Sequence, residues 1–180
     1  MTTKKITLLS IILFAFSCST ISEREKRINS TEEIALKAYN AQITGDIETF
    51  KSLLSADFTF TLTGKLDISQ TYAWDEYMKF AAYFGSLLKG EVGDEFGEII
   101  AGEYAANVFT NGKMEGIGGK YENEYAIKYT VNSEGKISNI KEWLSDILLA
   151  TQLYGQQIEG MHIDPETVSY THLTLPTMFE

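Results

Sequence analysis

The chain has 180 residues with a formal net charge of -10, and 44% of them are hydrophobic, which suits one globular domain with a packed core. The acidic balance excludes nucleic acid as a partner, because phosphate contacts require clustered Lys and Arg. The only arginines are Arg24 and Arg27, so a domain that begins after them has no guanidinium to bind phosphate or carboxylate.

The first 18 residues are predicted to be an export signal. Two lysines precede an apolar run, residues 6–16, that is too short to span a bilayer. Small residues then lead to Cys18 in an arrangement that resembles a bacterial lipobox, so lipid on Cys18 would anchor the protein to the membrane. Ordinary cleavage is the alternative, since Ala15 and Ser17 fit the small-x-small rule. We expect a lipoprotein of the bacterial cell envelope, or otherwise a secreted or periplasmic protein.

Because Cys18 is the only cysteine, the domain has no disulfide, thiol nucleophile or cysteine metal site. We expect neither a metal nor a cofactor. Residues 19–29 are interpreted as a polar linker, and the alternative is a solvated extension of the helix that follows.

Residues 30–155 are predicted to form the domain. Ser30 with Glu33 makes a capping-box pattern, which predicts that the first helix starts there. The helix ends at the Thr-Gly-Asp sequence of residues 44–46, where Asp46 caps a second, short helix.

The segment ADFTFTLTG, residues 56–64, alternates Phe and Leu with Thr and predicts a strand with one buried face. A third helix is predicted from Trp74 to Leu88, and three glycines after it are interpreted as loose connections: Gly90, Gly93 and Gly97. Three more strands and two hairpin turns follow, with strands at 98–110, 120–131 and 136–144 and turns at 111–113 and 132–136. Helices followed by an antiparallel meander predict the α+β class.

Two segments carry a family resemblance: AYNAQITGDIETFKSLLSADFTF at 38–60 and NSEGKISNIKEWLSDILLATQLYG at 132–155. They resemble the SnoaL-like group of the nuclear transport factor 2-like superfamily, with its ketosteroid isomerase-type cone fold. The resemblance implies N-terminal helices packed on a curved, mainly antiparallel sheet that encloses a conical pocket. It also implies a possible homodimer formed through the outer face of the sheet.

The family's catalytic groups are not matched residue by residue. Aligned through the two shared turns, the isomerase tyrosine falls on Ala38, the base aspartate on Leu62 and the second acid on Ile127. None of these side chains transfers a proton. A one-residue gap puts Tyr39 in the first place. The Asp-Arg-Asp relay of epoxide-hydrolase relatives cannot be built without arginine.

Cyclase relatives use an inward carboxylate, so the direction of each acidic side chain matters. In residues 121–131 the aromatic row is predicted to face inward, which places Glu122 and Glu124 outside in a charge set with Lys128. Alternation does not decide whether Glu142 or Trp143 faces inward. A buried Glu142 would have a raised pKa and could act as an acid near neutral pH.

The remaining acid, Asp146, either accepts a proton at the mouth of the pocket or, like Ser145, caps the next helix. The catalytic candidates are therefore Glu142, Asp146 and Tyr39. The predicted ligand-binding residues, for which plain core packing is the alternative, are Tyr39, Trp74, Tyr77, Asn123, Tyr125, Tyr129 and Trp143.

We predict a non-catalytic domain that binds a small apolar ligand or a protein partner. One alternative is a proton-transfer enzyme of the isomerase or cyclase type, and another is a structural dimer module. A carboxylate inside the cone would favour the enzyme over the binding module.

Residues 156–166 are interpreted as a tail, in which His162 is solvated. The stretch VSYTHLTLPT, residues 168–177, can be encoded by a string that resembles a translated sequencing-library adapter. We therefore interpret residues 167–180 as an artefact, which removes His172 from the possible ligands.

Overall fold

The computed structural model describes residues 3–157, with side chains from Glu23 onward except that of Glu91. The predictions for His162, His172 and residues 167–180 lie outside the described residues, as does most of the tail at 156–166. Cys18 lies in a helix, in a stretch where only the backbone is described.

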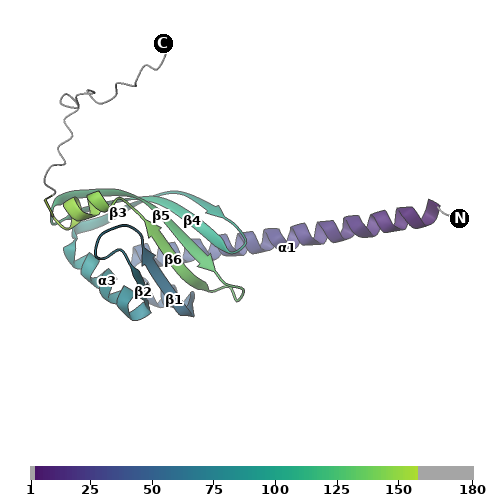
Figure 1. The fold of residues 1–180 in the computed structure, drawn as a ribbon, viewed down its shortest axis with the longest axis horizontal. Helices are drawn as coiled ribbons and strands as arrows, with labels where there is room; N and C mark the ends of the chain where they lie inside the picture. Colours follow the sequence, from purple (N-terminus) through teal and green to yellow (C-terminus); the bar gives the residue numbers. More distant parts are fainter. Residues whose placement is uncertain (1–2, 158–180) are drawn as a thin grey trace, which may run out of the picture.

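Helix α1 (Thr3–Thr44) is one continuous element of 42 residues. The predicted helix start at Ser30 is therefore wrong, and the polar segment before it extends the helix, which was the alternative interpretation. No Gly or Pro interrupts this stretch, and Glu, Lys and Arg favour helix. Figure 1 shows the N-terminal part of α1 extending far beyond the sheet. Within residues 3–157, no helix has the length and hydropathy needed to cross a membrane.

Both arginines tie α1 to the turn between the third and fourth strands. The Arg24 and Arg27 Nε atoms lie 3.2 and 3.6 Å from the Glu103 carboxylate. Arg27 also donates a 2.8 Å hydrogen bond to the Tyr104 hydroxyl and lies over its ring. Thr31, which is buried, donates to the Glu103 carbonyl. We call these contacts the arginine clamp.

The next two helices are confirmed. Helix α2 (Ile47–Ser52) begins after Asp46, whose Oδ1 accepts a 3.0 Å hydrogen bond from the Thr49 amide. Helix α3 (Trp74–Leu87) matches its predicted range, and Glu76 accepts from the Ala73 amide at its start.

Six strands form one curved sheet in the order β2-β1-β6-β5-β4-β3. Only the β1–β6 pair is parallel, so the sheet is mainly antiparallel and the α+β prediction is confirmed. The strands are β1 (Leu54–Leu62), β2 (Thr71–Ala73), β3 (Lys89–Ala101), β4 (Ala105–Gly116), β5 (Gly119–Val131) and β6 (Ile137–Trp143). Their inner face packs on α3 and the C-terminal part of α1 (Figure 1).

Strand β3 corrects the interpretation of three glycines as loose connections. Gly90, Gly93 and Gly97 all lie inside this strand, and the predicted turn at 111–113 lies inside β4. The glycines instead accompany register shifts, one of which inserts Gly97 between the pairs Phe96–Thr110 and Glu98–Phe109. A Cβ at Gly97 would lie 2.9 Å from the Phe109 carbonyl oxygen, so this bulge requires glycine. The predicted turn at 132–136 is confirmed.

The end of the domain is closed by α4 (Asp146–Leu148) and a π-helical turn, η1 (Leu149–Leu153). Ser145 caps α4 by accepting from the Leu148 amide, as one interpretation predicted. Backbone amides of the β4–β5 turn donate hydrogen bonds to carbonyl oxygens of η1, which holds η1 against the end of the sheet.

Candidate functional site

A cavity of about 280 Å³ lies between α1, the end of α3 and the inner face of strands β3 to β6. Its walls are mostly apolar or aromatic, with a few polar groups, as is typical of small-molecule sites. The lining residues are Tyr39, Gln42, Ile43, Phe84, Leu88, Val92, Gly93, Asp94, Thr110, Gly112, Met114, Tyr125, Ile127, Tyr129 and Glu142.

The register of β6 decides the direction of Glu142. Its partners in the neighbouring strands are Leu62 and Ile127, and both are buried on the inner face. Directly opposite side chains share a face, so Glu142 points into the cone. Trp143 therefore points outward, where 40% of it is exposed and the Lys141 ammonium lies 5.1 Å from its ring.

Burial raises the pKa of Glu142 from an ordinary 4.5 to about 7. Its side chain lines this cavity and also borders a smaller one of about 150 Å³, which is lined by Phe60, Leu62 and Leu149 among others. Among the described residues the carboxyl has no hydrogen-bond partner. Glu142 can therefore gain and lose a proton near neutral pH inside the cone.

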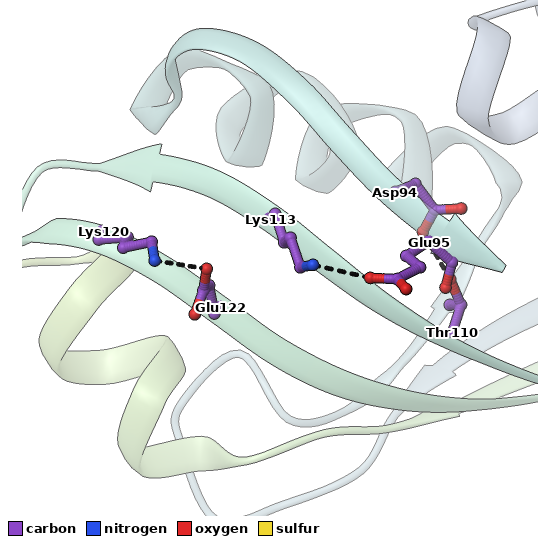
Figure 2. A network of polar contacts seen from close by, with 6 residues as sticks. All are labelled: Asp94, Glu95, Thr110, Lys113, Lys120 and Glu122. Atoms are coloured by element: carbon purple, nitrogen blue, oxygen red, sulfur yellow. Dashed lines mark hydrogen bonds and ion pairs between the residues drawn. The ribbon is translucent and has the colours of Figure 1, made fainter. Parts of the chain in front are cut away.

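A second carboxylate, Asp94, lies across the cavity on β3. Thr110 donates a 2.6 Å hydrogen bond to Asp94 Oδ1, and the Tyr39 hydroxyl donates to Asp94 Oδ2. Figure 2 shows Asp94 and Thr110 side by side on neighbouring strands. The bulge at Gly97 lets Asp94 and Phe96 face inward while Glu98 pairs with the outward Phe109.

Tyr39 is a poor proton donor to a ligand. Burial, together with its hydrogen bond to Asp94, raises the pKa of Tyr39 to about 12. Its single proton is held by Asp94, so it orients that carboxylate. Among the three catalytic candidates, Tyr39 and Glu142 line the cavity.

Tyr125 presents a hydroxyl to the cavity through a chain of side chains. The Asn123 amide oxygen accepts from the Ser145 N–H, so its NH₂ group donates to the Tyr121 hydroxyl at 3.1 Å. The Tyr121 and Tyr125 hydroxyl oxygens lie 2.8 Å apart, and either can donate to the other. When Tyr121 is the donor, the Tyr125 proton is available to a molecule in the cavity. Burial raises the pKa of Tyr125, so the hydroxyl stays protonated.

Gln42 links two more tyrosines. The Tyr129 hydroxyl donates to Gln42 Oε1 at 2.8 Å, and Gln42 Nε2 donates to the Tyr77 hydroxyl at 3.0 Å. The buried side chain of Tyr129 thus has a partner inside the protein, and its ring forms a fixed wall.

Three of the seven predicted ligand-binding residues line the cavity: Tyr39, Tyr125 and Tyr129. Tyr77 borders the smaller cavity, and Trp74 packs against Phe50 and Phe58. Asn123 borders a polar hollow of about 470 Å³ that lies beside β4 and β5.

Asp146, the third catalytic candidate, lies away from the cavity. Its Oδ2 accepts a 2.7 Å hydrogen bond from the Lys65 amide, and it packs closely on Gly64. It therefore holds the β1–β2 connection against the start of α4.

Glu122 and Glu124 face outward, as predicted, because β5 keeps an unbroken register with β4. The predicted partner is wrong: Glu122 pairs with Lys120 at 2.7 Å, while Lys128 lies opposite Lys141. Figure 2 shows this ion pair beside that of Lys113 with Glu95. Within residues 3–157, no group of three or more His, Cys, Asp or Glu side chains could hold a metal ion.

Asp94 and Thr110 are the site residues that the sequence pattern missed. The glycines around Asp94 favour a connection rather than a strand, so the pattern predicts no direction for its side chain. A strand interrupted by Gly97 is also typical of a β-bulge, and that signal could have placed Asp94 on the inner face.

No family model matches the sequence, and no curated protein matches it. Solved structures do match. Bal32a, from a soil-derived mobile gene cassette, has a TM-score of 0.61 at 15% identity, over 70% of this chain and 96% of its own. An NTF2-like protein from Burkholderia xenovorans LB400 has a TM-score of 0.57 at 15% identity, over 69% of this chain and 96% of its own. The chain has the NTF2-like cone fold.

A third match is a Kribbella flavida protein for which ketosteroid isomerase activity is proposed. Its TM-score is 0.53 at 18% identity, over 66% of this chain and 80% of its own. In this NTF2-like cone the cavity lies inside the cone, with Glu142 at one wall and Asp94 at another.

Proposed function

We propose that the domain is a proton-transfer enzyme that acts on a small, largely apolar molecule. The observation that carries this proposal is the Glu142 carboxyl, which faces the cavity without a hydrogen-bond partner among the described residues and titrates near pH 7. A general base or acid works best when its pKa lies near the working pH.

The site supports abstraction of a proton next to a carbonyl group. Ionised Glu142 takes the proton, and the C–H electron pair moves toward the carbonyl oxygen. Tyr125 donates a hydrogen bond to that oxygen as negative charge develops on it. Glu142 then returns the proton to another atom of the same molecule, which gives an isomer.

The reaction class agrees with the activity proposed for the Kribbella flavida protein, although the likeness covers the fold alone. The catalytic residues differ from those expected of the isomerases, because Leu62 and Ile127 occupy two of the acidic positions that the resemblance implies. Here Glu142, which lies between those two residues in the sheet, supplies the acid.

Hydrogen exchange tests the proposal. The chain is incubated in D₂O with a panel of small cyclic ketones, and deuterium uptake next to the carbonyl is followed by mass spectrometry. We expect uptake that rises through pH 7 and falls about a hundredfold in Glu142→Gln. The control is Glu124→Gln, which removes an exposed carboxylate from β5. Uptake that is equal in wild type and Glu142→Gln would contradict the proposal.

Ligand binding without catalysis is the second candidate. It is favoured by the mostly apolar cavity walls and by the missing acids at Leu62 and Ile127. In that case a ligand would bind in the cavity of about 280 Å³, and Glu142→Gln would leave every exchange rate unchanged.

We propose further that export and lipid on Cys18 hold the protein at the bacterial cell envelope. Residues 19–29 are helical, so they would act as a rod of roughly 16 Å between lipid and domain. Fatty-acid labelling in a bacterial host should tag the wild type and not Cys18→Ser. Equal labelling of the two would remove the anchor.

A homodimer through the outer sheet face remains a proposal. Ile100, Phe109 and Trp143 are 55, 37 and 40% exposed there, and Phe109 and Trp143 both lie opposite Ala126. Sedimentation should show a dimer that Phe109→Glu converts to a monomer. A monomeric wild type would contradict this proposal.

A further inference from the structure

The charges around the cavity all have one sign. Asp94 and Glu142 contribute two carboxyl groups, and none of the described lining residues is Lys, Arg or His. The nearest basic residue along β4, Lys113, points to the outer face and pairs with Glu95 at 2.7 Å. An anionic ligand would therefore meet repulsion from Asp94, and also from Glu142 once that carboxyl is ionised, with no compensating charge.

The Asp94 carboxylate accepts hydrogen bonds from neutral hydroxyl groups only. It accepts from Tyr39 and Thr110, and it forms no ion pair within the described part of the chain. A partly buried carboxylate without a counter-charge gains most from a cation that brings its own charge into the site.

The other walls also suit a cation. Phenol rings of Tyr39, Tyr125 and Tyr129 surround the space, and ring faces attract ammonium groups. The net charge of -10 adds an attractive field for cations at longer range. Glu142 lies on the opposite side from the β3 wall, where it can meet the apolar, reacting end of the molecule.

We propose that the cavity selects a flat organic cation, whose ammonium group binds Asp94 while its apolar body extends toward Glu142. This inference deepens the proposed function, since it names the class of molecule that the same site takes.

Three probes of matched shape test the selection at pH 6: naphthylmethylamine as the cation, naphthylmethanol as the neutral analogue and naphthoic acid as the anion. Calorimetry should show that the amine binds about tenfold more tightly than the alcohol, and that the acid binds at least tenfold more weakly than the alcohol. A ranking with the alcohol or the acid above the amine, or no binding of any probe, would overturn the proposal.

A variant locates the preference. Asp94→Asn keeps an oxygen for Tyr39 and removes the charge, so the amine should lose its tenfold advantage while the alcohol binds as before. Glu95→Gln is the matched control, because that carboxylate lies one residue away on the outer face. An advantage that survives Asp94→Asn, with alcohol binding intact, overturns the assignment to Asp94. If Asp94→Asn does not fold, the ranking of the three probes on the wild type still decides the proposal.

The outcome is separable from that of the proposed function. Loss of deuterium uptake in Glu142→Gln without a cation preference would retain proton transfer and reject this ligand class. A cation preference with no deuterium uptake in the wild type would retain the ligand class and reject proton transfer.

Discussion

Two halves of the cone contain similar aromatic residues and use them differently. In one half Phe50, Phe58, Trp74 and Tyr77 pack ring on ring with centroids 6.1–6.3 Å apart. In the other half Tyr125 and Tyr129 of β5 line the cavity. One difference lies in the inner face of the sheet beside these tyrosines, where Gly112 supplies no side chain to the cavity wall. Inward aromatic residues therefore make a core or a pocket according to the residues that lie beside them.

The packed half should be the more sensitive to truncation. Phe50 is 1% exposed and contacts three aromatic rings, so Phe50→Ala should lower the free energy of unfolding by about 4 kcal/mol. Tyr125→Phe, in the open half, should cost less than about 1.5 kcal/mol, since it keeps the ring. Urea denaturation measures both. Equal losses would mean that the two halves are packed alike.

Glu142 should destabilise the open half as pH rises. Its folded pKa of about 7 lies above the unfolded value, so the folded state holds the proton more tightly. The stabilisation is complete below about pH 4.5 and is lost as pH rises through 7, by about 3 kcal/mol at most. Glu142→Gln should remove this loss and be the more stable protein at pH 8. Thermal melts from pH 5 to pH 8 test it, and parallel curves for the two proteins would refute the raised pKa.

A side chain at Gly112, in the cavity wall, should lower both the stability of the fold and the volume available to a ligand. A Cβ on Gly112 would lie 2.8 Å from Met114 Cε and 2.9 Å from the Tyr125 ring. Gly112→Ala should therefore lower the free energy of unfolding by about 2 kcal/mol and weaken binding of all three naphthyl probes. Unchanged stability and unchanged probe binding would show that Met114 and Tyr125 move to accommodate the added methyl group.

The smallest effect is expected for a glycine-to-alanine substitution in α3, which serves as the reference for Gly112→Ala. Gly85 lies in α3 with nothing within 4 Å of an added Cβ. Gly85→Ala should raise the free energy of unfolding by about 0.5 kcal/mol, because Ala favours helix, and should leave probe binding unchanged. A loss of stability here would indicate an unseen contact on α3.

Residue patterns predicted the helices after Gly45, the inward faces of β1 and β5 and the class of fold, because periodicity depends only on local direction. They could not place Glu142, whose direction depends on pairing with Leu62 and Ile127 from distant segments. They missed Asp94, because the bulge at Gly97 reverses the phase of β3. Nor could they separate Tyr125, which lines the cavity, from Trp74, which lies in the core, since cavity volume depends on packing across the cone.

The arginine clamp connects α1 to the strands that carry part of the candidate site. Glu103 and Tyr104, which the clamp grips, join β3 to β4, and these strands carry Asp94 and Thr110. A displacement of α1 at these contacts would therefore act on the strand pair that carries Asp94 and Thr110. Through these contacts α1 is joined to the two strands that form one wall of the cavity.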